Sequence, residues 1–198
     1  MSSLLYKNPV VYEKVLSLVH RNNFSKRYNL MADLIGKRKK VLDLGCGSGV
    51  LTKYLDDSCS YFGIEANKRF AEHCQKKGLE VTHGNLFEVD FPQVDTVVIS
   101  DVLHHILPNH KKLLAKAKKV SKTIIICEPK HKKGKISSFV GYNRYFFKLL
   151  GDYDGINDFE TMAQWTFSET ELKKLLSNFG QTKTYELGES IVAEVKLN

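Results

Sequence analysis

The sequence predicts an α/β protein built on one doubly wound sheet of mostly parallel strands, and three observations support this prediction. Short apolar segments alternate with segments of helical periodicity along most of the chain. The first apolar segment that reads as a strand runs into a turn with glycines at alternate positions, in the stretch VLDLGCGSGV of residues 41–50. The last two apolar segments are joined by a short link, so they are expected to form an antiparallel pair.

Each element follows from this alternation. Two amphipathic helices are expected over residues 10–20 and 25–35 as an N-terminal cover, with Ser25 as the cap of the second. The alternation of strands and helices implies parallel βαβ units with right-handed crossovers, so the first five strands are expected to be parallel with helices on both faces of the sheet. Seven strands are expected, over residues 40–44, 61–65, 80–83, 95–100, 123–127, 182–186 and 191–196. Further helices are expected over residues 50–55, 68–77, 110–119 and 168–178.

The length of 198 residues fits a single domain, and no repeat or linker of Pro, Gly and Ser divides it. We expect four parts: the helical cover at 1–36, a ligand-binding core at 37–129, a lid insert at 130–167, and a closing helix with an antiparallel strand pair at 168–198. Because ligands of such sheets bind outside the carboxyl ends of the strands, the insert is expected to roof the site.

Charge is segregated along the chain, which has a formal net charge of +8. Residues 111–135 hold ten lysines and one acid, Glu128. On the predicted helix of this run the apolar residues face inward and Lys112, Lys116 and Lys119 face outward. A solvated face and a surface that binds anions both stay open.

The four cysteines are widely spaced and form no CxxC pair, so neither a disulfide framework nor a zinc site is expected. No apolar run approaches the roughly twenty residues of a membrane span, and the N-terminal residues lack the pattern of a secretory signal. We therefore expect an unprocessed cytoplasmic protein, either a monomer or a homodimer. A peripheral contact with a membrane surface stays open.

The glycine turn indicates a ligand that lies very close to the backbone. Gly45, Gly47 and Gly49 are spaced as GxGxG, whereas a P-loop needs GxxxxGK followed by Ser or Thr, and a dinucleotide fingerprint needs GxGxxG. Asp43 precedes the turn, and Glu65 ends the next predicted strand twenty residues after Gly45. A carboxylate at this second position can accept hydrogen bonds from the two hydroxyls of a ribose. The pattern favours a nucleoside without a pyrophosphate.

Four stretches carry a resemblance to a known family. They are VLDLGCGSG, GIEAN, GNLFEVDFP and DTVVISDVLHHI, and in this order and at these intervals they resemble the class I S-adenosylmethionine-dependent methyltransferases. The resemblance covers residues 39–127, and the tail WTFSETELKKLLSNFG is similar to the closing segment of the family. The run DVLHHI resembles the small-molecule and quinone-type branch, methyltransferase type 11 or 12. The resemblance implies a Rossmann-like fold, S-adenosyl-L-methionine as the cofactor, S-adenosyl-L-homocysteine as the product, and a transferase of the EC 2.1.1 type.

The resemblance also implies which residues bind the methyl donor. Asp43 and the backbone of the glycine turn would hold its methionine part, Glu65 its ribose, and Asn85 with the next residue its adenine. Each has a plainer alternative: Asp43 could order the turn, Glu65 could serve the start of a helix, and Asn85, where the family often has Asp, could be a turn residue. The implied residues are Asp43, Gly45, Cys46, Gly47, Glu65, Ala66, Asn85, Leu86, Ser100, Asp101 and Val102, of which the last three would line the methyl side.

His104 and His105 follow the fourth strand on its ligand side. A histidine can accept the proton that a hydroxyl, an amine or an activated carbon loses on methylation, so His105 is the candidate catalytic base. The alternative is that both imidazoles only pack beneath the donor. No metal site is expected, because adjacent histidines on a short turn are expected to point apart and no clear third ligand is nearby. Arg27 and Tyr28, on the covering helix, are candidates to close over the donor.

The sequence leaves the methyl acceptor open. The position after the fourth strand reads SDVLHH rather than Asp or Asn followed by Pro-Pro and an aromatic residue, which disfavours methylation of a base amine. The basic loop of residues 130–135 could meet phosphates of RNA, a phospholipid or a phosphorylated metabolite. The aromatic stretch of residues 136–150 could line a hydrophobic pocket, rest on a membrane surface or pack as an ordinary lid. We expect a small-molecule or lipid-like acceptor, methylated at O, N or an activated carbon. The alternatives are an RNA methyltransferase that uses the lysine-rich surface, a regulatory subunit that binds S-adenosylmethionine without catalysis and, more distantly, a dehydrogenase.

Overall fold

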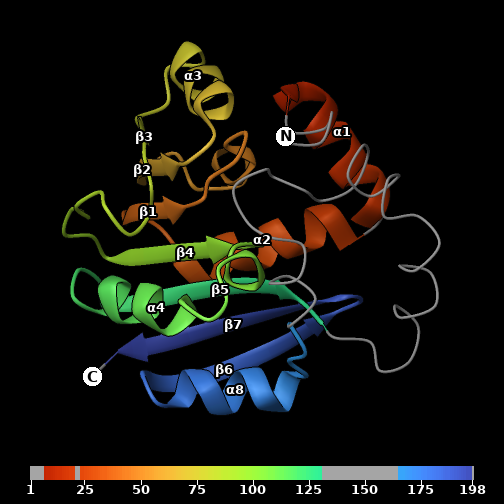
Figure 1. Ribbon diagram of the computed structural model, residues 1–198, viewed down its shortest axis with the longest axis vertical. Coiled ribbons are helices and arrows are strands. Elements are labelled where there is room, and N and C mark those ends of the chain that lie inside the picture. The colour runs from red at the N-terminus through yellow and green to blue at the C-terminus, as the bar shows by residue number, and fades with distance from the viewer. Residues whose placement is uncertain (1–6, 21–22, 131–164, 198) are drawn as a thin grey trace.

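The computed structural model describes residues 7–20, 23–130 and 165–197 (Figure 1). Most of the predicted lid insert lies outside the described residues, and so do the aromatic stretch and all but the first residue of the basic loop. Among the helices that are described, none is both long enough and apolar enough to cross a membrane.

The seven predicted strands form one sheet in the order β3-β2-β1-β4-β5-β7-β6 (Figure 1). The first five strands pair in parallel, and β7 runs antiparallel to both β5 and β6. The predicted sheet, mostly parallel with one reversed strand, is thus confirmed. The strands are β1 (Lys40–Leu44), β2 (Ser60–Glu65), β3 (Val81–His83), β4 (Thr96–Ser100), β5 (Thr123–Pro129), β6 (Gly180–Leu187) and β7 (Ser190–Leu197).

Helices cover both faces of this sheet, and α1 stands beyond the carboxyl ends of its central strands (Figure 1). Asn67 caps α3 by accepting a hydrogen bond from the Arg69 amide at 3.0 Å, and Ser168 forms a capping box with Glu171 at the start of α8. The helical elements are α1 (Pro9–His20), α2 (Asn23–Ile35), η2 (Val50–Lys53), α3 (Lys68–Lys76), η3 (Leu103–His105), α4 (His110–Lys118) and α8 (Glu169–Ser177), η2 and η3 being 3₁₀ turns.

Alternating side chains of the central strands enter two cores. In β4, Val97 and Ile99 pack in the core beside α4 and α8, whereas Val98 packs on the opposite face beside α2. Strands buried on both faces must be apolar almost throughout, which is why β1, β4 and β5 read as continuous apolar runs. Leu44 of β1 lies opposite Ile99 of β4, so the two strands end close to each other. The residues that follow them in the chain therefore meet at one edge of the sheet.

Two predicted helices are wrong in detail, one at its start and one in its type and length. The second helix already begins at Asn23, so Ser25 lies within its first turn, where its hydroxyl accepts a hydrogen bond from Tyr54 Oη at 3.3 Å. The helix expected over residues 50–55 is only the 3₁₀ turn of residues 50–53. It follows directly on Gly49, whose left-handed backbone (φ 73°) sets the chain direction there.

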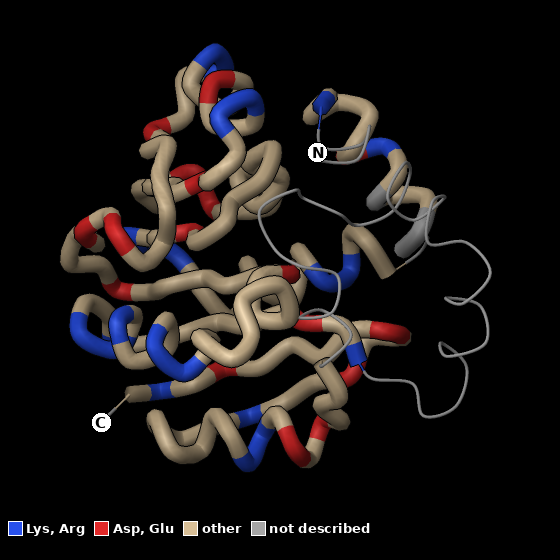
Figure 2. The backbone as a smooth tube through the Cα atoms, in the orientation of Figure 1, with Lys and Arg blue, Asp and Glu red and all other residues tan. Residues whose placement is uncertain are grey.

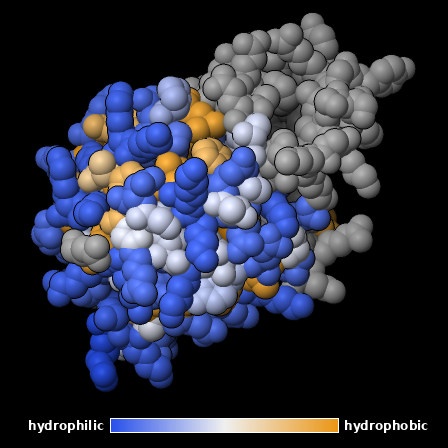
Figure 3. All heavy atoms as spheres, turned by 90° about the horizontal axis from the view of Figure 1, so that it is seen from below, coloured by the Kyte–Doolittle hydropathy of each residue, from blue (hydrophilic) through white to orange (hydrophobic). Residues whose placement is uncertain are grey.

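The helical periodicity predicted that the outward lysines of α4 would all be solvated, and the structure shows that one of them is not. The blue segments of Figure 2 mark this run, in which Lys112 and Lys119 are exposed. Lys116 is half-buried: its Nζ donates to the carbonyl oxygens of Leu86, at 2.9 Å, and Val89. Figure 3 views the molecule from the side of α8 and β6, where the described surface is mostly hydrophilic and its hydrophobic patches are small and separate. The expectation of an outward, solvated Lys116 is corrected, because the loop after β3 folds over that side of α4.

Candidate functional site

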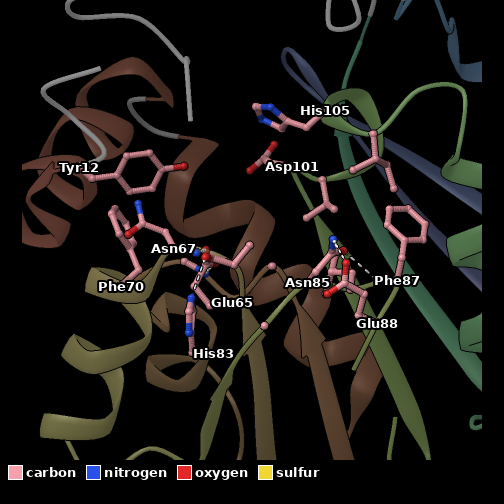
Figure 4. A pocket seen from close by; sticks show the side chains of 17 residues that line it. Tyr12, Glu65, Asn67, Phe70, His83, Asn85, Phe87, Glu88, Asp101 and His105 are labelled. Atoms are coloured by element: carbon pink, nitrogen blue, oxygen red, sulfur yellow. Dashed lines mark hydrogen bonds between the residues drawn. The ribbon is translucent and has the colours of Figure 1, made fainter. Parts of the chain in front are cut away.

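A cavity of about 690 Å³ opens at the carboxyl ends of β1, β2 and β4 (Figure 4). A smaller cavity of about 60 Å³ adjoins it and shares Tyr12, Gly45, Gly47 and Asp101 with it. The larger cavity is lined by nine of the predicted site residues: Gly45, Gly47, Glu65, Ala66, Asn85, Leu86, Asp101, Val102 and His105. The smaller cavity is lined by the other three: Asp43, Cys46 and Ser100.

The glycine turn forms the floor between the two cavities. The amides of Gly45 and Cys46 both donate to the Ile64 carbonyl, at 2.8 and 3.2 Å, which ties the turn to the end of β2. Gly45 has φ 72°, and a Cβ there would come within 2.6 Å of Val102 Cγ2. Gly47 also has positive φ, 55°, but a Cβ there would meet nothing within 4 Å. The turn therefore needs glycine for its backbone at both positions and leaves open space above Gly47.

Glu65 connects the glycine turn to the start of α3. Its Oε2 accepts the Gly47 amide at 2.8 Å and its Oε1 accepts the Asn67 amide at 2.7 Å. The side chain thus serves the helix start, which was the plainer alternative for this residue. Because each carboxylate oxygen can accept two hydrogen bonds, these contacts remain compatible with a ribose in the cavity.

Asp43 is almost fully buried, at 4% exposure, and Tyr61 Oη donates to its Oδ2 at 3.0 Å. Burial raises the pKa of this carboxyl to about 7, while the bond from Tyr61 lowers it and the negative charge of Glu65 raises it further. The bond from Tyr61 of β2 shows Asp43 bridging two strands. Cys46 packs on the same side of the turn, since a Cβ on Gly63 would lie 2.8 Å from its Sγ.

Arg27 lies beneath Asp101 rather than over the cavity. The guanidinium of Arg27 is fully buried and donates to both oxygens of Asp101, at 3.3 Å from Nη1 and 2.5 Å from Nη2. Burial alone would lower the pKa of Arg27, but the charge of Asp101 reverses this and raises it. Tyr28 packs on the guanidinium and lines the smaller cavity. Asp101 itself has a positive φ of 55°, which turns the chain sharply after β4.

Asn85 orders the loop after β3. Its Oδ1 accepts the Phe87 amide at 3.0 Å and its Nδ2 donates to Glu88 Oε1 at 3.2 Å, as a turn residue does (Figure 4). The plainer alternative for Asn85 is thus seen in the structure, and its contact with an adenine stays a prediction. Leu86, the next residue, is buried and lines the cavity.

The two histidines face different surroundings. His105 lines the cavity beside Asp101 (Figure 4). His104 is buried, and its Nδ1 lies 2.6 Å from Oε2 of Glu128, a residue of β5 that sequence reasoning noted only as an isolated acid. The ring centroids of His104 and His105 are 4.1 Å apart at 39°, so the expectation that they point apart is wrong.

Eight residues that line the larger cavity had not been predicted as site residues, and Tyr12, Phe70 and His83 are three of them. The rings of Tyr12 on α1 and Phe70 on α3 meet edge to face, with centroids 5.2 Å apart (Figure 4). His83 ends β3, and its Nε2 lies 3.1 Å from the Ala66 carbonyl. The position of His83 at a strand end was a usable signal, since such ends meet at one edge. For Tyr12 the sequence held no such signal beyond its position in the predicted N-terminal helices.

These features define a class of protein. The sheet order, the single reversed strand, the glycine turn after β1 and the carboxylate after β2 together form the architecture of a class I methyltransferase. Residues 42–124 match a family model described as a methyltransferase domain. Over these residues, and in its fold, the chain is similar to the class I S-adenosylmethionine-dependent methyltransferases.

Curated relatives match part of the chain. A stretch of 92 residues is 36% identical to trans-aconitate 2-methyltransferase of Mycobacterium ulcerans and covers 44% of this chain and 35% of that protein. A stretch of 102 residues is 33% identical to trans-aconitate 2-methyltransferase of Mycobacterium tuberculosis and covers 49% and 38%. The matches thus span little more than a third of the length of these relatives.

Solved structures resemble the fold over more of the chain. A putative O-methyltransferase from Nostoc punctiforme has a TM-score of 0.68 at 17% identity, and the match covers 97% of this chain and 60% of that one. Magnesium protoporphyrin IX methyltransferase from Synechocystis, solved with bound SAH, has a TM-score of 0.63 at 15% identity, with 89% and 84% covered. Identities this low show likeness of the fold.

Proposed function

We propose that the chain binds S-adenosylmethionine in the larger cavity and transfers its methyl group to a small-molecule acceptor. One observation carries this proposal: Glu65 and the Gly47 amide meet at 2.8 Å on the cavity floor, where a Cβ on Gly47 would find open space. A nucleoside can approach the backbone there while its ribose hydroxyls donate to a carboxylate. A cavity of about 690 Å³ is in the usual range for sites that take ligands of this size.

The remaining roles follow the positions of the side chains. The buried carboxyl of Asp43 and the glycine turn would hold the methionine part, and the loop at Asn85 and Leu86 would flank the adenine. Asp101, Val102 and His105, from the turn after β4, would lie on the methyl side. The chain thus supplies alignment and exclusion of water, which are the main requirements of an in-line methyl displacement.

The acceptor loses a proton when it is methylated through O, N or an activated carbon. In this step the acceptor atom bonds to the methyl carbon, the carbon–sulfur electron pair passes to sulfur, and the proton leaves the acceptor. We assign His105 as the group that receives this proton, because it lines the cavity beside Asp101 (Figure 4).

The described lining bears on the charge of the acceptor. It holds Glu65, Glu88 and Asp101 and, within the described residues, neither Lys nor Arg. An anion such as the aconitate named in the relatives is usually bound through Arg or Lys, so we propose a neutral or cationic acceptor instead. The lysines of α4 line a separate groove with Phe87, and this arrangement gives no support to RNA as the acceptor.

The test has two parts. Calorimetry with S-adenosylhomocysteine should show binding to the wild-type chain and none to Gly47→Val, whose side chain would enter the cavity. Labelled S-adenosylmethionine with fractionated cell extract should then show which fraction receives the methyl group. His105→Ala should keep the binding and lose turnover, while His73→Ala, a histidine of α3 outside the cavity lining, should keep both.

Absence of binding by the wild-type chain would exclude the proposed function. Binding without transfer to any fraction would instead indicate a regulatory subunit. Label in the RNA fraction would contradict the small-molecule acceptor.

A further inference from the structure

Glu128 is a fully buried carboxylate at the carboxyl end of β5. β5 lies between β4 and β7, so the side chain of Glu128 reaches the turn that follows β4. A carboxylate so completely removed from water must be compensated by hydrogen bonds or an opposite charge. Its partners therefore indicate what it does.

Four hydrogen bonds compensate the carboxylate, and all four come from one turn. Oε1 accepts the amides of Val102 and Leu103, at 2.9 and 2.7 Å. Oε2 accepts the amide of His104 at 3.4 Å and contacts its ring Nδ1 at 2.6 Å. Because an ionised carboxylate only accepts hydrogen bonds, the Nδ1 of His104 carries a hydrogen in this arrangement.

The turn that Glu128 holds also carries side chains of the cavity. Val102 and His105 both line the cavity, and the amide of Val102 is one of those bonded to Glu128. The ring of His104 lies against the ring of His105, with centroids 4.1 Å apart. Glu128 thus fixes one cavity residue through its backbone and the other through an intervening imidazole.

We propose that Glu128, acting through His104, is the positioning residue that holds Val102 and His105 against the transferring methyl group. This inference rests on the proposed function, because it names what sets the geometry of the same site. Glu128 is not among the residues that line the larger cavity, so its effect comes through the placement of the turn. A displacement of about 1 Å at a reacting centre can cost on the order of a hundredfold in rate.

Glu128→Gln tests the proposal with little change in size. Its amide group would face donors at Oε2, so the turn should shift. Steady-state kinetics with labelled S-adenosylmethionine and the extract fraction that accepts methyl should show kcat reduced about tenfold or more, while the affinity for S-adenosylhomocysteine changes less than about threefold. The matched control is Glu194→Gln, a buried glutamate on β7 that pairs with Lys196 at 3.6 Å and lies away from the cavity.

His104 supplies a test by conservative replacement. In His104→Asn the side-chain amide can donate to Glu128 from nearly the same position as Nδ1, so turnover should stay close to that of the wild type. His104→Ala has no donor there and should lose turnover. Hydrogen exchange measured by mass spectrometry gives a readout that needs no acceptor. In Glu128→Gln the amides of residues 102–104 should exchange about tenfold faster, and those of β6 and β7 should be unchanged.

The outcomes separate the two proposals. Wild-type turnover in Glu128→Gln, or a loss that appears equally in donor affinity, would overturn the role of Glu128. A Glu128→Gln chain that fails to fold would move the decision to the pair His104→Asn and His104→Ala, where equal turnover would overturn it as well. If the wild-type chain binds no S-adenosylhomocysteine, the proposed function fails, while hydrogen exchange still decides whether Glu128 holds the turn.

Discussion

The guanidinium of Arg27 donates hydrogen bonds to both carboxylate oxygens of Asp101 and so joins α2 to the turn after β4. Arg27 is fully buried, whereas the Asp101 side chain keeps 24% of its exposure on the cavity side. Removing the cation takes both of these charge-assisted hydrogen bonds away from a carboxylate that is partly buried. We predict that Arg27→Met lowers the free energy of unfolding by about 3 kcal/mol, measured by urea denaturation.

Two companion variants sharpen this prediction. Arg27→Lys should cost less than Arg27→Met, because the ammonium keeps a positive charge beside Asp101. It should still cost some stability relative to the wild type, because a single ammonium cannot bond both carboxylate oxygens in the same geometry. Lys26→Met, on the exposed side of the same helix, should change the free energy of unfolding by less than about 0.5 kcal/mol. Equal effects at residues 26 and 27 would contradict the importance of the pair.

Gly45 approaches Val102 so closely that the two positions are coupled. An added Cβ at Gly45 would lie 2.6 Å from Val102 Cγ2, on a backbone with φ 72°. Gly45→Ala should therefore lower the free energy of unfolding by about 2 to 4 kcal/mol, in part from the clash and in part from the backbone. The double variant with Val102→Ala should be less destabilised than the sum of the single variants.

Gly78→Ala is the matched control for the part of the destabilisation that comes from the positive φ of the backbone. Gly78 has φ 78°, and a Cβ there would meet nothing within 4 Å. Its cost should be about 1 to 2 kcal/mol, below that of Gly45→Ala. If the two glycine variants cost the same, the contact with Val102 contributes nothing.

The buried carboxyl of Asp43 should make stability depend on pH. Burial raises its pKa to about 7 in the folded chain, above the ordinary value of 3.8. Between these two values the folded state binds more protons than the unfolded state, so this contribution is present below about pH 4 and lost as the pH rises through 7. From pH 5 to pH 8 the wild-type chain should lose about 2 kcal/mol more than Asp43→Asn in urea denaturation.

Tyr61→Phe tests in which direction the hydrogen bond from Tyr61 moves the pKa of Asp43. The phenol of Tyr61 lowers the pKa of Asp43, so its removal should raise that pKa and move the pH dependence upward. The difference between wild type and Asp43→Asn would then appear at higher pH in the Tyr61→Phe background. A shift to lower pH would show that the hydrogen bond stabilises the neutral form instead.

Lys116 holds the loop after β3, part of which lines the larger cavity. Its ammonium donates to two carbonyls of that loop and lies 4.0 Å from the centroid of the Phe91 ring. Lys116→Met should lower the free energy of unfolding by about 1 to 2 kcal/mol and weaken S-adenosylhomocysteine binding severalfold. Lys112→Met, one turn earlier and exposed, should do neither in the same denaturation and calorimetry measurements.

The edge of the sheet where the cavity forms could be predicted from the sequence. Asp43, Glu65 and Ser100 each stand at or near the end of an apolar run, and parallel strands bring such ends together. The fold class could also be predicted, because buried strands and amphipathic helices differ in the period of their apolar residues. The prediction needed no knowledge of which side chains touch.

Partners across the fold could not be predicted in this way. Helical periodicity shows that Lys116 faces away from the sheet, but it does not show that a loop thirty residues earlier lies over it. Glu128 read as an isolated acid among lysines, yet its partners lie on the turn after β4. Both residues bond mainly to backbone groups, which carry no side-chain pattern that a sequence could display.

The sheet register pairs Glu128 with Ile191 of β7, so the last strand of the chain flanks the residue that holds the turn. On a ribosome, every described residue that lines the cavity emerges before β7 does. Until β7 arrives, β5 presents an open edge, and closing it requires residues far apart in the chain to meet. The nascent chain therefore contains the parts of its binding site before it contains the strand that firmly supports them.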